Sequence, residues 1–223
     1  MGYLLRVENL EKSFEKLKVL DGINLSVGEG ERVAILGPSG CGKTTLLKII
    51  ARLEREDSGV VERNFRSIGF VFQSPNLIPW LTVIENLLFV KEDVKKALEI
   101  LEMVGLSGFE DYFPRQLSGG MRQRVNLARA LMVDPDLILF DEPFSSLDFH
   151  IKRRLIDEIL ALQKEKGFSS ILVTHDPFEA LRLSEKILVL SEKPSRIVDV
   201  LETSKCTFED VVLSLERATS MPP

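Results

Sequence analysis

The chain carries near its start the stretch Gly37-Pro38-Ser39-Gly40-Cys41-Gly42-Lys43-Thr44-Thr45. This stretch matches the pattern G-x-x-x-x-G-K-[ST], whose glycines let successive backbone N–H groups turn inward around a phosphate chain. Residues 32–36, which are apolar after Arg32, predict a strand before the loop, and residues 45–51 predict the opening of a helix after it. A phosphate at such a helix N-terminus is stabilised by free N–H groups and by the helix dipole. We expect the Lys43 ammonium to reach the β- and γ-phosphates of a nucleotide, and the Thr44 hydroxyl to hold Mg²⁺.

The composition fits a large packed domain and argues against several other classes of protein. The 223 residues are 44% apolar, enough for a sizeable core, and the net charge of −5 argues against nucleic acid as a partner. No apolar run approaches the ~18 residues that a membrane-spanning helix needs. One of the 2 cysteines lies inside the glycine loop, so we expect no structural disulfide and a reducing cytosol.

The hydrophobic pattern predicts alternating strands and helices with a helical insertion. Continuous apolar runs at residues 137–140 and 170–173 are typical of buried parallel strands. The other expected elements are strands over residues 4–7, 19–21, 23–27 and 67–72, helices over 94–104, after Gly119 and over 149–167, a hairpin of 187–190 and 196–201, and an amphipathic stretch after Thr203.

Two carboxylates directly follow one of these buried strands. Apolar residues 137–140 end in Asp141 and Glu142. An aspartate at such a strand tip holds the Mg²⁺ shell in many enzymes that carry a phosphate loop. We therefore expect Asp141 to contribute to that shell and Glu142 to polarise the water that attacks the γ-phosphate.

The stretch Leu117-Ser118-Gly119-Gly120-Met121-Arg122-Gln123-Arg124 narrows the class of nucleotide enzyme. Alone, a serine and two glycines before a helix form an ordinary N-cap. Together with the phosphate loop and the carboxylate pair, the stretch resembles the signature motif of ATP-binding cassette (ABC) proteins. The resemblance implies that ATP and Mg²⁺ are bound, and that two chains form a head-to-tail dimer with the nucleotides between them. The residues that would contact the partner's nucleotide are Ser118, Gly119, Gly120 and Gln123.

Four more positions match motifs of the same family. Ser145-Ser146-Leu147-Asp148 resembles the D-loop, so Asp148 is expected to touch the partner subunit. Gln73 matches the Q-loop glutamine, which contacts Mg²⁺ or water, and His175 matches the switch histidine, which contacts the γ-phosphate. Phe14 matches the aromatic residue that stacks on adenine, where tyrosine is more usual. The alternative interpretation of Phe14 is a core aromatic after a strand.

The resemblance extends from Leu4 to about Leu201 and implies the fold. We expect a single α/β ABC ATP-binding domain, with a P-loop NTPase (RecA-like) core, a small antiparallel β-subdomain and an α-helical signature subdomain. The expected boundaries are about 1–74 and 134–201 for the β-subdomain and P-loop core, about 75–133 for the helical subdomain, and 202–223 for a C-terminal tail.

Within the family, the chain resembles the importer ATPases for nitrate, sulfonate, taurine and similar small solutes. The residues that carry this likeness are 73–83, 121–124, 144–148 and 189–197. Some pyrimidine and riboflavin-precursor importers share the pattern, so both solute classes stay open. The resemblance implies a cytoplasmic protein, peripheral on the inner face of a prokaryotic membrane. It would work with a separate permease and, indirectly, with a solute-binding protein.

The permease is expected to dock on the segment from Gln73 to Trp80. Its apolar side chains stand among turn residues, which is unusual for a solvated loop. The alternative is that Trp80 packs into its own domain. For the whole chain, the alternatives are a soluble ABC ATPase without a transport role and a small-molecule kinase. Residues 117–120 and Glu142 argue against the kinase.

Cys41 is expected to be a reactive thiol. It lies near a helix N-terminus and beside Lys43. Both features favour the thiolate and lower the pKa of a cysteine.

Overall fold

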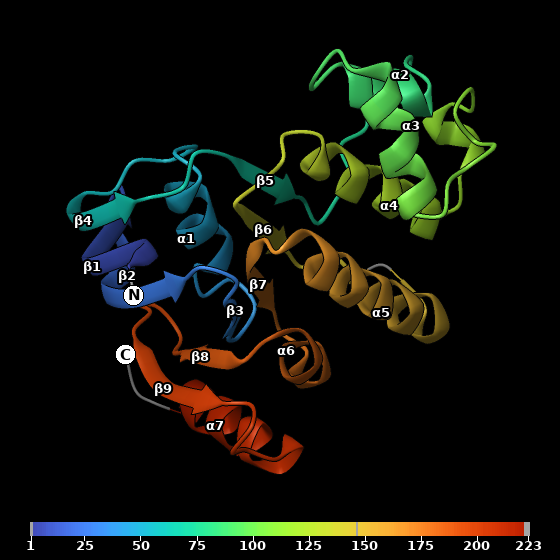
Figure 1. The fold of residues 1–223 in the computed structure, drawn as a ribbon. Helices are drawn as coiled ribbons and strands as arrows, with labels where there is room; N and C mark the ends of the chain where they lie inside the picture. The colour runs from blue at the N-terminus through green and yellow to red at the C-terminus, as the bar shows by residue number, and fades with distance from the viewer. Residues whose placement is uncertain (1, 146, 221–223) are drawn as a thin grey trace. The chain divides into compact units, whose positions relative to one another are not determined.

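The computed structural model describes residues 2–145 and 147–220, which Figure 1 shows as a ribbon. They form two compact units. The first contains the described residues up to Phe65 and those from Ser169 onward, and the second runs from Arg66 to Phe168. The second unit is therefore an insertion in the first, because the chain leaves the first unit and later returns to it. The boundaries of the three subdomains expected from the sequence stay a prediction.

The first unit contains an antiparallel sheet with the strand order β2-β1-β4 and a second sheet in which β7, β3, β8 and β9 are neighbours. In the second sheet β7, β3 and β8 run parallel, and β9 pairs with β8 in the antiparallel sense. The elements of this unit are β1 (Tyr3–Phe14), β2 (Leu17–Gly28), β3 (Arg32–Leu36), α1 (Lys43–Ile50), β4 (Ser58–Arg63), β7 (Ser169–Thr174), α6 (Pro177–Leu183), β8 (Lys186–Leu190), β9 (Ile197–Glu202) and α7 (Phe208–Ser220).

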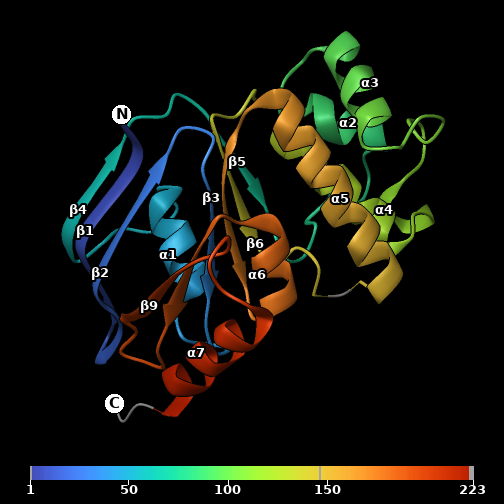
Figure 2. The ribbon, with the colours of Figure 1, turned by 60° about the horizontal axis from the view of Figure 1, so that its bottom comes forward.

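The centre of the first unit is β3. Four of its five residues are buried, because β3 lies between two parallel neighbours and packs against α6. Figure 2 shows α6 and α7 close to each other beside β8 and β9. This burial explains why the strand before the glycine loop reads as a continuous apolar run.

The start of the chain differs from the prediction. In place of three short strands, the structure has the two 12-residue strands β1 and β2, paired along their length. Their pairing shifts register at several points, and near one of them Asn9 has a φ of 46° and donates its N–H to the Asn24 side chain. Such bulges interrupt the alternation of apolar and polar residues, so the pattern divides one strand into pieces.

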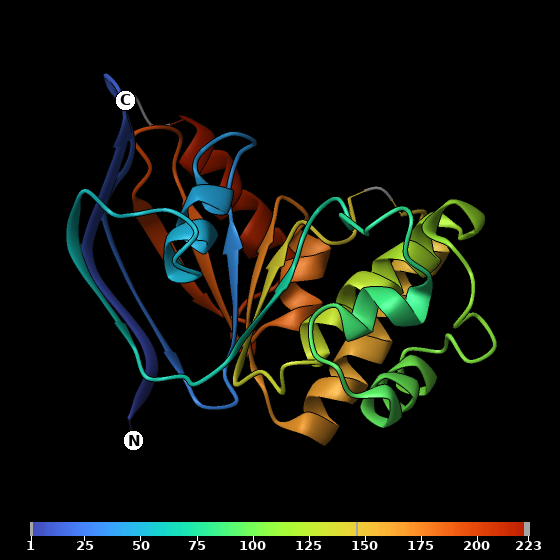
Figure 3. The same ribbon diagram turned by 90° about the horizontal axis from the view of Figure 1, so that it is seen from above.

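The second unit combines two parallel strands with a cluster of helices. Figure 3 shows α2, α3 and α4 gathered together, and their mutual contacts agree. On α3, Val94 and Leu98 stay exposed, whereas Ala97, Ile100 and Leu101 are buried. The elements are β5 (Ile68–Val71), α2 (Val83–Leu88), α3 (Val94–Met103), a short 3₁₀ helix (Pro114–Gln116), α4 (Gly119–Leu131), β6 (Leu137–Asp141) and α5 (Phe149–Lys166).

Helix α4 lies close against β5. A Cβ added to Gly69 would stand 2.7 Å from the Ala130 carbonyl oxygen, so only glycine lets the strand approach the helix this closely. This packing fixes α4 next to the loop that follows β5. Several candidate site residues lie on that loop. Over residues 2–145 and 147–220, no helix combines the length and apolarity that crossing a bilayer requires.

Candidate functional site

The glycine loop leaves β3 at the carboxyl edge of the parallel sheet. Leu36 and Thr174, the last residues of β3 and β7, face each other in parallel register. The residues that follow, Gly37 and His175, therefore leave neighbouring strand ends. Ligands of open α/β sheets bind at this edge. The first unit thus brings the predicted phosphate loop and the predicted switch histidine to the same edge of one sheet.

Close packing requires two of the glycines of this loop, Gly37 and Gly42. Gly42 has a φ of 122°, and a Cβ there would lie 2.8 Å from Val19 Cγ1. A Cβ on Gly37 would lie 3.0 Å from the Leu190 carbonyl oxygen. The loop is therefore held between β2 and the end of β8, with no room for larger side chains. A cradle of backbone N–H groups without side chains in the way suits a phosphate chain.

The Lys43 side chain folds back over the loop. Its Nζ donates to the carbonyl oxygens of Gly37 and Pro38 at 2.8 and 2.9 Å, and the residue is only 4% exposed. The ammonium is thus fixed beside the loop instead of moving freely in water. Thr44 follows in the first turn of α1 and is exposed.

The expectation of a reactive Cys41 is wrong. Cys41 is only 2% exposed, and burial raises the pKa of its thiol, outweighing the opposing effect of Lys43. Sequence proximity to a lysine and a helix N-terminus does not report burial, and burial disfavours the charged thiolate. The residue fills space behind the loop and contributes its backbone to the loop.

The alternative placement of Phe14 in the core is also wrong, because the side chain is 43% exposed at the end of β1. One cation lies against the ring: Lys12 Nζ is 5.0 Å from its centroid. That ammonium is held in place by Glu54 at 3.0 Å and Asp57 at 3.2 Å. An exposed aromatic ring supported in this way is suited to stacking on a planar base.

The end of β7 is fixed by a buried hydrogen bond. The Thr174 hydroxyl donates to Glu179 Oε2 at 2.5 Å, and it accepts the Asp176 N–H at 3.0 Å. Asp176 in turn caps α6 by accepting the Phe178 N–H. His175 lies between these anchored residues and is exposed. Its backbone is therefore constrained while its imidazole is accessible.

The second unit brings the acidic pair and Gln73 to a common edge. β5 and β6 are parallel, with Val71 opposite Phe140, so Gln73 and Asp141 leave neighbouring strand ends. Asp141 is 7% exposed, and the partly exposed Glu142 has a φ of 44°. A non-glycine residue in this region costs on the order of 1–3 kcal/mol, and such strain concentrates at functional sites. Glu142 is therefore a strong candidate for a catalytic carboxylate.

The predicted D-loop lies close to Gln73. Gln73 Nε2 donates to the Ser145 hydroxyl at 3.3 Å, which joins these two motifs directly. Asp148 is exposed and caps α5 by accepting the Ile151 N–H at 3.1 Å. Ser146, the other serine of this motif, lies outside the described residues. Asp148 thus has a structural role as an N-cap beside its predicted role at a partner surface.

The signature stretch opens α4. Ser118 is exposed and caps the helix by accepting the Met121 N–H at 3.3 Å. Gly119 is exposed, whereas Gly120 is buried, and a Cβ on Gly120 would stand 2.8 Å from Ile151 Cγ2. The second glycine is therefore required by packing against α5. An exposed serine at a helix N-terminus provides a hydroxyl and free N–H groups for an anion.

Three side chains of α4 hold the loop that carries Gln73. Gln123 and Asn126 donate to the Phe72 carbonyl oxygen at 3.2 and 2.8 Å, and Arg129 donates to that of Asn76 at 2.9 Å. Gln123 is 3% exposed, which favours this positioning role over the predicted contact in trans. Asn126 and Arg129 were not predicted as functional residues from the sequence. The spacing of the amides at positions 123 and 126 on one helix face was the available signal.

Trp80 is presented to solvent on an ordered loop. The side chain is 75% exposed, so the alternative of packing into its own domain is wrong. Asn86 is fully buried, accepts the Ile78 N–H at 2.9 Å, and donates to the Leu81 carbonyl at 3.1 Å and the Thr82 carbonyl at 2.9 Å. One buried amide thus fixes the backbone on both sides of an exposed indole, which is typical of a binding surface.

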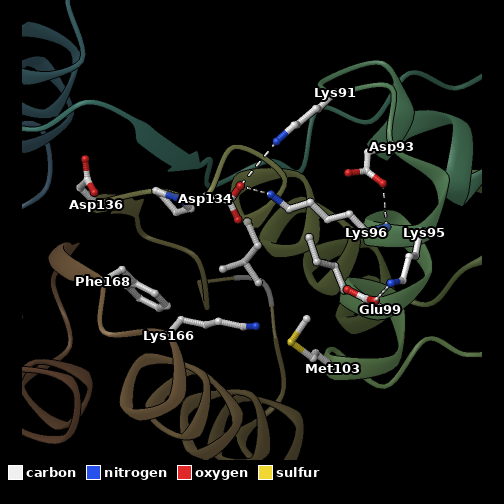
Figure 4. A pocket seen from close by; sticks show the side chains of 13 residues that line it. Lys91, Asp93, Lys95, Lys96, Glu99, Met103, Asp134, Asp136, Lys166 and Phe168 are labelled. Carbon is white, nitrogen blue, oxygen red and sulfur yellow. Dashed lines mark hydrogen bonds and ion pairs between the residues drawn. The ribbon is translucent and has the colours of Figure 1, made fainter.

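A cavity of about 540 Å³ in the second unit lies outside these motifs. Figure 4 shows Lys91 and Lys96 directed toward Asp134, and Lys95 beside Glu99. The ion pairs join Lys91 to Asp134 at 3.5 Å, Lys96 to Asp134, and Lys95 to Glu99 at 3.8 Å. The hydrogen bond from Lys96 lowers the pKa of Asp134. Because these charges pair with one another, the cavity has no surplus of cations for a phosphate chain.

The oxygen groups predicted for Mg²⁺ fit that ion chemically. Thr44 offers a hydroxyl, Asp141 a carboxylate and Gln73 an amide oxygen. Mg²⁺ prefers oxygen donors and usually takes one or two protein groups, the rest being waters and substrate phosphates. Within the described part of the chain, no cluster of three or more His, Cys, Asp or Glu could hold a metal unaided. The donor set therefore fits an ion that binds together with a nucleotide.

The chain is similar in sequence and in structure to known ATP-binding proteins. The family described as "ABC transporter" matches residues 20–145. The aliphatic sulfonates import ATP-binding protein SsuB 1 of Pseudomonas syringae pv. syringae (strain B728a) is 46% identical over 209 residues, which cover 92% of this chain and 87% of that protein. Its counterpart SsuB of Bacillus licheniformis is 44% identical over 213 residues, covering 88% and 83%. A dimeric post-hydrolysis state of the ATP-binding cassette MJ0796 bound to ADP and Pi has a TM-score of 0.79 and 35% identity, covering 89% of this chain and 98% of that one.

Proposed function

Because this chain belongs to the ABC transporter family, we propose that it energises the uptake of a small solute through a separate membrane permease. Its part in that process is to bind and hydrolyse ATP. The observation that carries a transport role is in the second unit, where α4 holds the Gln73 loop that presents Trp80 to solvent. Ser118 is the N-cap of the same helix. The exposed indole is thus connected to the helix whose N-cap is the signature serine. This connection suits an ATPase whose activity is coupled to a partner protein bound at the indole.

Each site residue then has a role in ATP hydrolysis. Phe14 stacks on the adenine, residues 37–45 bind the phosphates, and Lys43 neutralises their charge. Thr44, Gln73 and Asp141 would hold Mg²⁺, which would offset the negative charge of the phosphates. Glu142 accepts a proton from the attacking water. His175 contacts the γ-phosphate.

The active form is a dimer that holds ATP between two copies of the chain. Ser118, Gly119 and Gly120 of one copy complete the site of the other. The exposed Ser118 hydroxyl and the N-terminus of α4 support this role, because together they favour an anion. Asp148 of the D-loop lies at the same dimer interface.

The permease docks on the loop from Gln73 to Trp80. This contact makes the protein peripheral on the inner face of a prokaryotic membrane. A solute-binding protein delivers the solute from the other side and does not contact this chain. Conformational signals from the permease reach Ser118 through the hydrogen bonds that join the loop to α4.

Replacing Trp80 with alanine is expected to weaken permease docking by about tenfold or more, because a central tryptophan commonly contributes at least ~2 kcal/mol at an interface. The melting temperature of the free subunit should not fall, since the side chain is 75% exposed. Binding of the subunit to permease in nanodiscs measures the first effect. Emission of this single tryptophan should shift to shorter wavelength on docking.

Phe208→Ala provides the matched control, because Phe208 is 54% exposed on α7 in the other unit. That variant should dock normally. Equal docking by the Trp80 variant and the wild type would exclude this loop as the permease surface.

The proposed solute is a small sulfonate or a nitrate- or taurine-like anion, and the alternative is a heterocyclic vitamin precursor. The two SsuB relatives described above are named as aliphatic sulfonates import ATP-binding proteins, which supports the first class. Deletion of the gene is expected to abolish growth on an aliphatic sulfonate as sole sulfur source. The wild-type gene should restore growth, and a gene encoding Glu142→Gln should not. Unimpaired growth of the deletion strain would argue against sulfonate as the solute.

A further inference from the structure

We propose that Ser195, in the turn between β8 and β9, is a positioning residue for ATP binding. Its hydroxyl holds the Cys41 carbonyl and thereby aims the Gly42 N–H at the bound phosphates. This inference rests on the proposed role of residues 37–45 as the ATP phosphate loop. It assigns a function to the segment 189–197, which the motifs of ATP hydrolysis leave without one.

Every polar group of Ser195 is engaged with the segments around the phosphate loop. The residue is fully buried, and its Oγ donates to the carbonyl oxygen of Cys41, 154 positions away in the chain. Its N–H donates to the Val19 carbonyl at 2.9 Å, and its own carbonyl accepts the Asp21 N–H at 3.0 Å. The turn is therefore paired to the same part of β2 that packs against Gly42.

The neighbouring residues hold this turn in place. Arg196 Nε donates to Asp21 Oδ2 at 2.7 Å, and Ser191 accepts the Arg196 N–H at 3.1 Å. Hydrogen bonds from Lys18 and Arg196 lower the pKa of Asp21, so this carboxylate stays ionised at neutral pH. Ser195 is thus held in place by hydrogen bonds on both sides of it in the chain.

The geometry of a trans peptide turns this contact into a constraint on the loop. In such a peptide the C=O of one residue and the N–H of the next point in opposite directions. A Cys41 carbonyl drawn toward Ser195 therefore directs the Gly42 N–H away from the turn, toward the side where phosphates bind. Gly40 and Gly42 have φ values of 78° and 122°, and glycines rotate with little steric hindrance. Without the Ser195 hydroxyl, the orientation of this peptide is less constrained.

Loss of the Ser195 hydroxyl leaves a buried carbonyl without its partner. Rotation of the Cys41–Gly42 peptide relieves that penalty but removes one N–H from the phosphate site. Hydrogen bonds to charged groups contribute about 1.5–3 kcal/mol, so loss of one corresponds to at least about a tenfold loss of affinity. The effect should fall on ATP binding, because the carboxylate and the water of the hydrolytic step are not involved.

The test measures MgATP binding by calorimetry and the steady-state constants KM and kcat for Ser195→Ala. The expected result is about a tenfold rise in both the dissociation constant and KM, with kcat within about twofold of wild type. The Gly42 amide resonance should shift when ADP is added to the wild type and shift less in the variant. Unchanged affinity and an unchanged Gly42 response would overturn the proposal.

Ser191→Ala is the matched control, since Ser191 lies in the same turn and is buried, and its hydroxyl bonds within the turn to Glu192 and Arg196 but not to the phosphate loop. It should bind MgATP like the wild type. An equal loss of MgATP affinity in both variants would show that the effect comes from general loosening of the turn, and this would overturn the proposal. If Ser195→Ala does not fold, Ser195→Cys keeps the shape of the side chain with a somewhat larger atom and a weaker donor, and should bind several-fold more weakly. Wild-type affinity of that variant would also overturn it. Failure of the wild type itself to bind MgATP would contradict the proposed function instead.

Discussion

Replacement of Glu142 by glutamine is expected to lower steady-state ATP hydrolysis by about 10²–10⁴-fold, the range that a general base contributes. ATP should still bind, because the phosphate loop lies in the other unit and retains Lys43. Glutamine has the shape of glutamate but accepts a proton poorly. The strained backbone, with its φ of 44°, is retained, so the variant isolates the proton-accepting role.

Phosphate release measures the rate of ATP hydrolysis, and calorimetry measures ATP binding. The variant should also accumulate as an ATP-bound dimer, because hydrolysis is the step that normally releases the two subunits. Glu165→Gln is the matched control, since Glu165 is an exposed glutamate on α5 of the same unit. It should hydrolyse ATP at the wild-type rate. A Glu142→Gln protein with normal turnover would remove Glu142 from the catalytic role.

The predictions that the structure bears out rest on local patterns. The glycine loop follows β3 and opens α1, and the acidic pair stands at the end of β6. Both placements depend on residues adjacent in sequence, and the side-chain chemistry and turn geometry of such residues can be read directly. The hairpin around Lys193 and Pro194 was predicted for the same reason.

The features that the sequence analysis missed are contacts between distant residues. The hydroxyl of Ser195 meets the Cys41 carbonyl only because β8 lies beside β3 and the following turn pairs with β2. No local pattern encodes that register. The burial of Cys41 has the same origin, and it reversed the predicted direction of the thiol pKa. Likewise, the Phe72 carbonyl is held by Asn126, which becomes visible only when α4 packs on β5.

The two units differ in how they fix their motifs. In the first, the loop is held by carbonyl contacts and tight glycine packing, as Gly42 and Lys43 show. In the second, side-chain amides hold backbone carbonyls, as Asn86 and Asn126 show. A rigid phosphate loop suits tight and repeated binding of one nucleotide. A loop tied to a helix by side chains suits the transmission of a movement, because the helix and the loop then move together.

Replacement of Ser118 by arginine is expected to abolish the ATP-driven dimer while each monomer still binds ATP. Ser118 is exposed at the N-terminus of α4, so a long side chain there occupies the space that the partner's phosphates would enter. The experiment is best made in the Glu142→Gln background, in which the dimer should persist. Light scattering with and without MgATP reports the mass, and calorimetry reports binding by the monomer.

Two further variants separate the dimer contact from the helix cap. Serine at the N-cap contributes about 1 kcal/mol through its bond to the Met121 N–H, and Ser118→Arg loses it. Aspartate is an equally good N-cap, so Ser118→Asp should keep the helix and still block the dimer, because its carboxylate repels the γ-phosphate. Ser107→Arg adds the same cation at an exposed loop position and should leave the dimer intact. If Ser118→Arg and Ser118→Asp both dimerise normally on ATP, the N-terminus of α4 does not contact the partner's nucleotide.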